Sequence, residues 1–120
     1  MLAPAASVFP LPDAIDFATA AALGLTFQTA HFALRRRANL SPGETVLVLG
    51  ASGGIGVASL QLARALGAAR VIGAVRSDAE AEVARAAGAD AVVRTDVADL
   101  RDRLRTDVLA ATDGHGADVV

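Results

Sequence analysis

The sequence of 120 residues contains no cysteine, lysine, tyrosine or tryptophan, and each absence excludes something. Without cysteine there is no disulfide framework and no thiolate metal site, so packing alone must hold the fold. Without lysine, a phosphate loop of the Gly-Lys-Ser/Thr type is impossible, which excludes nucleotide hydrolysis of that kind. Only four aromatic residues are present, all phenylalanine, so the core must be built from alanine, valine, leucine and isoleucine.

Charge and hydropathy exclude further classes of function. All eleven basic residues are arginine and the net charge is −2, which gives no field that would favour nucleic acid or an acidic membrane surface. The first twelve residues contain three prolines and lack the basic start and apolar core of a signal peptide, and no stretch of 18 apolar residues occurs. We therefore expect no nucleic-acid partner, no membrane association and a cytoplasmic location.

The segment before residue 41 predicts two helices. In "PDAIDFATAAAL", Asp13 is the expected N-cap and Asp16 falls in the first turn. Gly24 is expected to interrupt this helix, and a second helix is expected from residue 25 to the three arginines at 35–37. Cations suit the negative end of a helix dipole, so we interpret these arginines as a solvated helix end.

From residue 41 onward, strand and helix patterns alternate. Pro42 and Gly43 occupy the places that a type II turn prefers. The first expected elements are a buried strand at 45–49 and a helix at 54–67, which has Ile55, Leu62 and Leu66 on one side and Gly67 at its end. A strand at 69–75 follows, and then a helix that a Ser77–Glu80 capping box opens and Gly88 closes. The last expected elements are a strand at 90–94, a helix with the apolar stripe Val97, Leu100, Leu104 and Val108, and the start of a fourth strand in "GADVV". This order predicts an α/β fold: a partial Rossmann fold, with a doubly wound parallel sheet of about four strands, preceded by the two helices.

Four glycines lie between the first strand and the helix after it: Gly50, Gly53, Gly54 and Gly56, in the spacing GxxGxxG. A dinucleotide-binding unit needs a sharp turn here, close approach of a pyrophosphate, and tight packing of helix on sheet, and each need excludes a Cβ atom. Amides at the start of the helix can then donate to phosphate oxygens. A tight turn without a ligand is the alternative explanation of the same glycines.

A rival motif can be tested on the same residues. Gly50, Gly54 and Gly56 also satisfy the GxxxGxG pattern of short-chain dehydrogenases. The chemistry of that family uses a tyrosine and a lysine, which this sequence lacks. That family also usually begins with its first strand, whereas the first strand expected here begins at residue 45.

Three stretches together resemble a known family: "LPDAIDFATAAALGLTFQTAHFAL", "LSPGETVLVLGASGGIGVASLQLARALGA" and "AGADAVV". In order and spacing they are similar to the medium-chain dehydrogenase/reductase superfamily, specifically its zinc-free quinone oxidoreductase (zeta-crystallin-like) branch. The resemblance covers nearly the whole chain. It implies a Rossmann domain that binds NADPH and an enzyme that delivers hydride to a quinone or to an activated C=C bond such as an enone.

The resemblance also implies which residues hold the cofactor. Thr26 matches the family threonine that contacts the nicotinamide end; the alternative is an ordinary helix threonine bonded to its own backbone. The implied contacts of the nucleotide are Thr26, Gly50, Ser52, Gly53, Gly54, Ile55, Gly56, Arg76 and Ser77. Zinc-dependent members carry a cysteine ligand where this chain has Ala22, so no catalytic zinc is expected. His31 and His115 are isolated and lack ligand spacing.

The end of the second strand predicts the choice of cofactor. NAD-binding domains place an acid there for the ribose 2′-hydroxyl, while NADP-binding domains offer arginine. The strand ends "AVRSD", with Arg76 and Ser77 in the place of the acid, which predicts NADPH. Two residues oppose this prediction: Glu80 stands where many relatives have a basic residue, and Asp78 is nearer still. A solvated charge at the end of the strand is the alternative interpretation of Arg76.

The resemblance implies two segments. Residues 1–40 would be the linker and helices that lead out of an N-terminal catalytic domain, and residues 41–120 an incomplete NAD(P)-binding Rossmann domain. No residue can be named as catalytic. Two further interpretations stay open: a non-catalytic nucleotide-binding fragment, and a piece of the enoyl reductase of a polyketide synthase. The expected partners are a small quinone or enone and either a second copy of the chain or a complementing chain.

Overall fold

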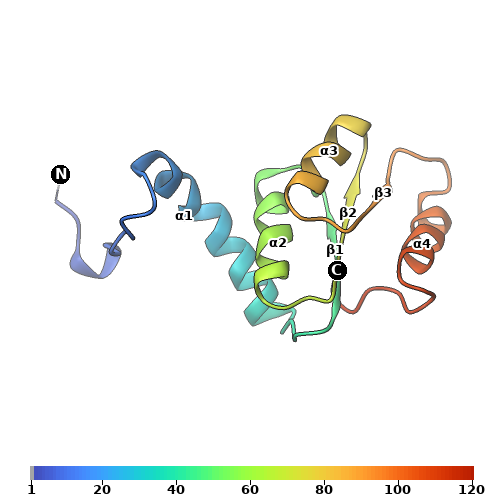
Figure 1. The fold of residues 1–120 in the computed structure, drawn as a ribbon, viewed down its shortest axis with the longest axis horizontal. Coiled ribbons are helices and arrows are strands. Elements are labelled where there is room, and N and C mark those ends of the chain that lie inside the picture. Colours follow the sequence, from blue (N-terminus) through green and yellow to red (C-terminus); the bar gives the residue numbers. More distant parts are fainter. Residues whose placement is uncertain (1) are drawn as a thin grey trace.

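A parallel sheet of three strands forms the centre of the computed structural model, which describes residues 2–120 (Figure 1). The strands are β1 (Thr45–Leu49), β2 (Arg70–Val75) and β3 (Ala91–Arg94), and they lie in the order β1-β2-β3. Val46 pairs with Val71, and Ile72 pairs with Ala91. The three expected strands are thus confirmed within one residue.

The expected fourth strand is present only as a single bridge. Val119 pairs with Val46 on the free side of β1, where the Leu47 N–H donates to the Val119 carbonyl at 2.8 Å. The prediction of about four strands was wrong to this extent, because one bridge does not make a ladder. The bridge places the last residues on the side of β1 opposite β2. Later parts of the chain therefore lie on both sides of β1, with β2 on one side and Val119 on the other. The carboxyl end of β1 is for this reason a topological switch point of the sheet.

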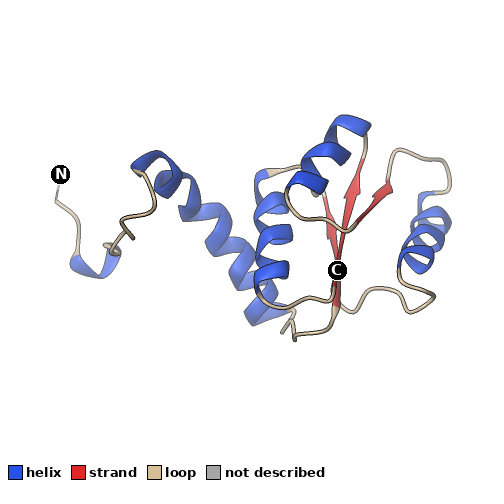
Figure 2. Cartoon of the chain, viewed as in Figure 1, coloured by secondary structure: helices blue, strands red, loops and turns tan. Residues whose placement is uncertain are grey.

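Helices cover both faces of the sheet, as a doubly wound fold requires (Figure 2). α2 (Gly54–Ala65) and α3 (Asp78–Ala86) pack on one face, and α4 (Leu100–Ala111) packs on the other. Alternate strand residues point to the two layers: the first core contains Val46, Val48, Leu60, Val71, Val75 and Ala84, and the second contains Leu47, Ile72, Ala74, Val93 and Val108. Aliphatic side chains fill both layers, as the shortage of aromatic residues predicts.

One helix, not two, leads into the sheet. α1 runs from Phe17 to Phe32 without a break at Gly24 and continues into a π-helical turn, Ala33–Arg37. A glycine inside a helix costs only about 1 kcal/mol relative to alanine, which good helix formers on both sides outweigh. The N-cap is Asp16, whose carboxylate accepts the Thr19 N–H at 2.7 Å, and not Asp13, which lies in the preceding turn.

Most local signals of the second half are confirmed, with one correction. Gly43 has a φ of +92°, as the third residue of a type II turn must, and the Glu44 N–H donates to the Ser41 carbonyl at 3.3 Å. The buried face of α2, however, is Gly56, Ala58, Leu60 and Ala63. The expected stripe through Ile55 was wrong at that residue, which is 50% exposed, because the small residues of α2 rest closest to the sheet.

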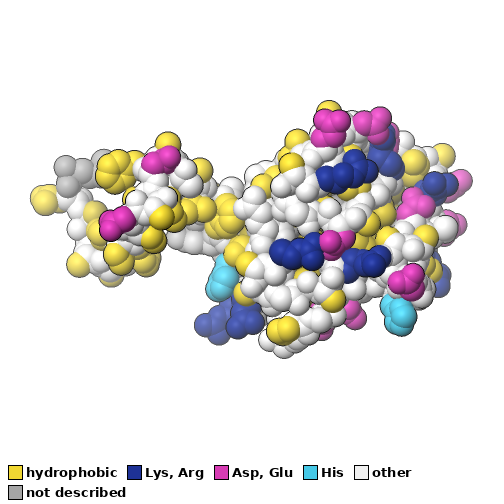
Figure 3. Space-filling model, in the orientation of Figure 1, with side chains coloured by type: hydrophobic (Ala, Val, Ile, Leu, Met, Phe, Trp, Pro, Cys, Tyr) yellow, Lys and Arg dark blue, Asp and Glu magenta, His cyan; other side chains and the backbone are white. Residues whose placement is uncertain are grey.

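Apolar side chains remain exposed on the arm that precedes the sheet. Residues 2–16 form an extended segment with a short 3₁₀ turn, Ala5–Ser7, and they project away from the body (Figure 3). The exposed side chains here and on α1 include Leu2, Val8, Phe9, Phe17 and Leu25. Among residues 2–120, no helix has the combination of length and apolar character that spanning a membrane demands.

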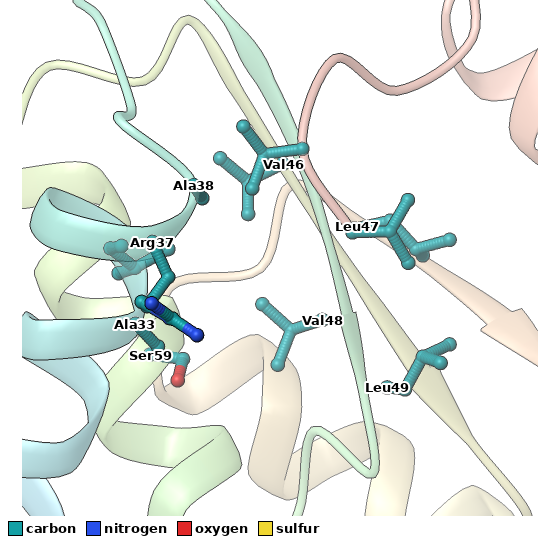
Figure 4. A pocket seen from close by; sticks show the side chains of 11 residues that line it. Ala33, Arg37, Ala38, Val46, Leu47, Val48, Leu49 and Ser59 are labelled. Atoms are coloured by element: carbon teal, nitrogen blue, oxygen red, sulfur yellow. The ribbon is translucent and has the colours of Figure 1, made fainter.

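A groove of about 540 Å³ follows the free edge of β1 (Figure 4). The π-helical turn after α1, α2 and the Val119–Val120 segment complete its walls. Val46 and Val48 point toward the helices, while Leu47 and Leu49 point to the opposite side of the strand (Figure 4). Beyond the bridge at Val119, this edge has no strand partner within residues 2–120. Free edges of this kind pair with other chains.

Asp90 joins the helical layer to two strands. Its Oδ2 accepts the Val71 N–H at 2.8 Å, and its Oδ1 pairs with the Arg64 guanidinium. Burial raises the pKa of Asp90, but the Val71 amide and the Arg64 charge outweigh that effect, so the pKa lies below its ordinary value. The stabilisation is therefore complete above about pH 4, the ordinary range of an aspartate, and is lost as the pH falls through the lowered pKa.

The free edge and the exposed arm predict self-association of the purified chain. Sedimentation velocity should show dimers or larger species whose share grows with concentration. Leu49→Lys places a charge on the edge, where Leu49 is 58% exposed, and should reduce this share without loss of folding. Val83→Lys, on the surface of α3, is the matched control and should leave it unchanged. A monodisperse wild-type monomer would contradict the prediction.

Asp90→Asn should destabilise the fold by about 1 kcal/mol at pH 7, the net worth of a charged hydrogen bond reduced by solvent screening. The difference from wild type should shrink as the pH falls below about 4, because protonated aspartate and asparagine are then equivalent. Urea unfolding over a range of acidic to neutral pH measures both effects. Asp113→Asn is the control, since Asp113 is exposed and lies in a turn. A difference that is constant over the whole pH range would refute the assignment.

Candidate functional site

The candidate site is the turn between β1 and α2, at the switch point of the sheet. Gly50 directly follows β1 and has a φ of +63°, so the chain reverses in a conformation that side-chain-bearing residues rarely adopt. The turn closes with a Gly53 N–H bond to the Gly50 carbonyl at 3.0 Å. The Ala51 N–H donates to the Ala74 carbonyl at 3.1 Å, which fixes the turn to the neighbouring strand β2.

Close packing requires a glycine at position 56. A Cβ atom on Gly56 would lie 2.8 Å from the Ala51 Cα and closer still to the Gly50 carbonyl oxygen. No backbone atom there can move without disrupting the turn, so only glycine allows α2 to lie this close to the end of β1. This is the third requirement of a dinucleotide-binding turn, and the structure meets it with a buried residue.

Gly53 and Gly54 keep space open at the start of α2. Gly53 is the N-cap of α2, is exposed, and has no side chain that caps the helix. The first amides of a helix lack partners within it, so those of Gly54 and Ile55 are donors for an anion at the positive end of the helix dipole. Ser52 is half-buried in the turn, and Ile55 is exposed beside it. We call the open space at these amides the phosphate cradle, because such donors suit a phosphate group. A Cβ atom on Gly53 would lie 3.4 Å from the Gly50 carbonyl oxygen.

α1 places Thr26 against this turn. A Cβ atom on Gly54 would lie 3.4 Å from the Thr26 Cγ2 atom. The Thr26 hydroxyl donates to the Ala22 carbonyl at 3.2 Å, as the simpler of the two interpretations expects. That bond uses the only proton of the hydroxyl and leaves its oxygen as an acceptor. The structure thus brings Thr26 into contact with the glycine turn, although they are distant in sequence.

Arg76 and Ser77 follow β2 at the same edge of the sheet, because parallel neighbours end on the same side. The Arg76 side chain is 78% exposed, and its Nη2 lies 3.2 Å from Glu80 Oε1. Ser77 is the N-cap of α3, and its Oγ accepts the Glu80 N–H at 3.2 Å, which confirms that half of the capping box. In the other half, the Glu80 carboxylate accepts the Arg76 N–H at 2.7 Å rather than that of Ser77.

The sequence placed Glu80 in a capping box and against the NADPH prediction, but it did not predict the contact of Glu80 with the Arg76 main chain. The Arg76 N–H, the Arg76 charge and the Ser52 hydroxyl hold the pKa of Glu80 below its ordinary value, against the opposing effect of partial burial. Glu80 is therefore a carboxylate held at the end of β2 by its contacts with Arg76. The four-residue spacing of Arg76 and Glu80 was the available signal, although Arg76 precedes the N-cap of α3 and is not itself helical.

The described residues offer no zinc site. Ala22 has no ligand atom, and His31 is exposed on α1. The ring Nδ1 of His115 lies 3.0 Å from the Thr112 carbonyl of its own turn. Within residues 2–120, no three histidine, aspartate or glutamate side chains gather in a metal-binding group.

Comparison with known proteins identifies the family. Residues 54–120 match the family model described as zinc-binding dehydrogenase. Since this match covers more than half of the chain, and quinone oxidoreductases are among its relatives, the chain belongs to the zinc-binding dehydrogenase family of the medium-chain dehydrogenase/reductase superfamily. The resemblance to this superfamily and to its quinone oxidoreductases is thereby confirmed, and the zinc-free character expected from the sequence stays a prediction.

Curated relatives include quinone oxidoreductases and polyketide synthases. The chain is 38% identical over 117 residues to the quinone oxidoreductase-like protein 2 homolog of Nematostella vectensis, covering 98% of this chain and 31% of that protein. It is 38% identical over 114 residues to the rat (Rattus norvegicus) quinone oxidoreductase, covering 95% and 33%. It is 37% identical over 113 residues to a phenolphthiocerol/phthiocerol polyketide synthase of Mycobacterium tuberculosis, covering 94% and 5%. The chain spans about a third of the length of the quinone oxidoreductase relatives.

Solved structures share the fold. An NAD-dependent alcohol dehydrogenase superposes with a TM-score of 0.85 at 37% identity, covering 98% of this chain and 33% of that one. Mycobacterial Rv1454c complexed with NADPH superposes with a TM-score of 0.80 at 34% identity, covering 96% and 34%. The CurK enoyl reductase superposes with a TM-score of 0.75 at 31% identity, covering 92% and 32%. The Rossmann-type fold expected from the sequence is confirmed.

Proposed function

We propose that this chain is the nucleotide-binding portion of an NADPH-dependent oxidoreductase that transfers hydride to a quinone or to an activated C=C bond. The observation that carries the proposal is the turn at the switch point, where Gly56 is fixed by packing while Gly53 leaves the helix amides open. The quinone oxidoreductase relatives and the neighbour complexed with NADPH support it.

In this proposal each part of the site holds a different part of the dinucleotide. The amides of Gly54 and Ile55 donate to the pyrophosphate, and Ser52 and Gly53 shape its cradle. Arg76, assisted by Ser77, lies at the position of the ribose 2′-phosphate. The Thr26 oxygen, an acceptor, is suited to the amide of the nicotinamide. When bound, the reduced nicotinamide supplies the hydride, and this chain binds and orients the donor.

A second candidate reaction has support of its own. The CurK enoyl reductase and the mycobacterial polyketide synthase are both similar to this chain over more than nine tenths of its length. Reduction of an enoyl thioester is also hydride addition to an activated C=C bond, so the same nucleotide site serves it. Residues that would select the acceptor are not among those described.

A binding fragment without turnover is the third interpretation, and a cytoplasmic location stays a prediction.

The proposal is tested by titrating the purified chain with NADPH and NADH and following nicotinamide fluorescence. Saturable binding with a preference for NADPH is expected. Oxidation of NADPH is then measured with a quinone and with an enoyl thioester. Binding without oxidation would favour the non-catalytic interpretation, and a folded chain that binds neither nucleotide would refute the proposal.

Gly53→Val should abolish NADPH binding while the chain stays folded. Gly53 has an extended backbone that valine can adopt, and its Cβ atom would meet the Gly50 oxygen only at 3.4 Å, an ordinary contact. The new side chain would occupy the phosphate cradle. Circular dichroism checks the fold and the titration checks affinity. Gly56→Val should instead prevent folding. Unchanged affinity in folded Gly53→Val would remove the glycine turn from the site.

Arg76→Ala should weaken NADPH binding by roughly tenfold and leave NADH binding nearly unchanged, because only NADPH has the 2′-phosphate. The two dissociation constants are measured in parallel. Arg85→Ala, which removes an exposed arginine at the other end of α3, is the control and should affect neither. An equal loss for both nucleotides, or none, would refute the role of Arg76.

A further inference from the structure

We infer that Glu80 limits the preference of the site for NADPH by competing with the 2′-phosphate for Arg76. The inference rests on the proposed function, because it concerns the nucleotide that the glycine turn would bind. It adds a residue that opposes one of the two cofactors.

The first support is the position of the carboxylate. Glu80 Oε2 accepts the Arg76 N–H at 2.7 Å, and Oε1 lies 3.2 Å from Arg76 Nη2. Glu80 itself is anchored through its own N–H to Ser77 Oγ at 3.2 Å. Its side chain is only 25% exposed, whereas that of Arg76 is 78% exposed. The carboxylate is therefore the fixed partner of this pair, and it already uses the donors that a 2′-phosphate would take.

The second support is the charge around the end of β2. The neighbouring arginine, Arg94, donates to the Arg76 carbonyl at 3.0 Å and pairs with Asp78 and Asp96, each at 2.6 Å. Its guanidinium is thus committed to two carboxylates. The two arginines together face three carboxylates, so these five groups carry a net charge of −1, which weakens the attraction of the region for a phosphate.

The third support is the chemistry of the two ligands. A phosphate monoester carries between one and two negative charges at neutral pH, and a carboxylate beside it repels it. The ribose 2′-hydroxyl of NADH is neutral and meets no such repulsion. Loss of the Glu80 charge therefore favours NADPH selectively, both by removing repulsion and by freeing Arg76.

Glu80→Gln is the test variant. Glutamine suits the third position of a helix and keeps an oxygen that can accept the Arg76 N–H, so folding should be retained. The dissociation constant for NADPH should fall roughly fivefold, while that for NADH should change less than about twofold. The gain should shrink in the Arg76→Ala background, because part of the proposed effect acts through Arg76. Glu82→Gln, an exposed neighbour on α3, is the matched control and should change neither constant.

Calorimetry with 2′,5′-ADP and ADP isolates the 2′-phosphate from the nicotinamide end, and only 2′,5′-ADP should bind more tightly to Glu80→Gln. Unchanged or weaker NADPH binding in the folded variant would overturn the inference. A loss of NADH affinity would also overturn it, because Glu80 would then be the acceptor of the ribose hydroxyls. If folded wild type binds no dinucleotide at all, the proposed function itself fails. If wild type binds NADPH and Glu80→Gln behaves identically, only the inference fails.

Discussion

The close approach of α2 to the end of β1 is the contact on which the site depends. It exists because Gly56 has no side chain to meet the backbone of Gly50 and Ala51. This contact fixes the direction of α2, and with it the direction in which the free amides of its first turn point. The bond from Ala51 to Ala74 joins the same turn to β2. The glycine turn is therefore attached both to α2 and to the neighbouring strand β2.

Much of this arrangement could be predicted from the sequence because the signals are local. A continuous apolar run predicted β1, short apolar stretches alternating with helix patterns predicted β2 and β3, and Ser77 predicted the start of α3. The errors arose where local signals are balanced by tertiary packing. Gly24 suggested a break, but the continuous helix wins because the cost of one glycine is small. Ile55 suggested a buried stripe, but the smaller residues of α2 allow closer packing on the sheet.

The candidate site was less predictable than the fold for a specific reason. The glycines and Arg76 are recognisable by type and spacing, whereas the role of Glu80 depends on where its carboxylate turns. A capping box directs that carboxylate to the N–H of Ser77, but here it reaches the N–H of Arg76. That shift of one residue brings the carboxylate to the main chain at the end of β2, beside the proposed nucleotide site. Spacing alone does not distinguish these two outcomes.

The contact between Thr26 and Gly54 has a mechanical consequence. α1 has no flexible loop within it, and it carries the exposed arm on one end while its middle rests on the first turn of α2. The side chain of Thr26 thus limits the free space beside Gly54. A change in the position of α1 relative to α2 would change that space directly.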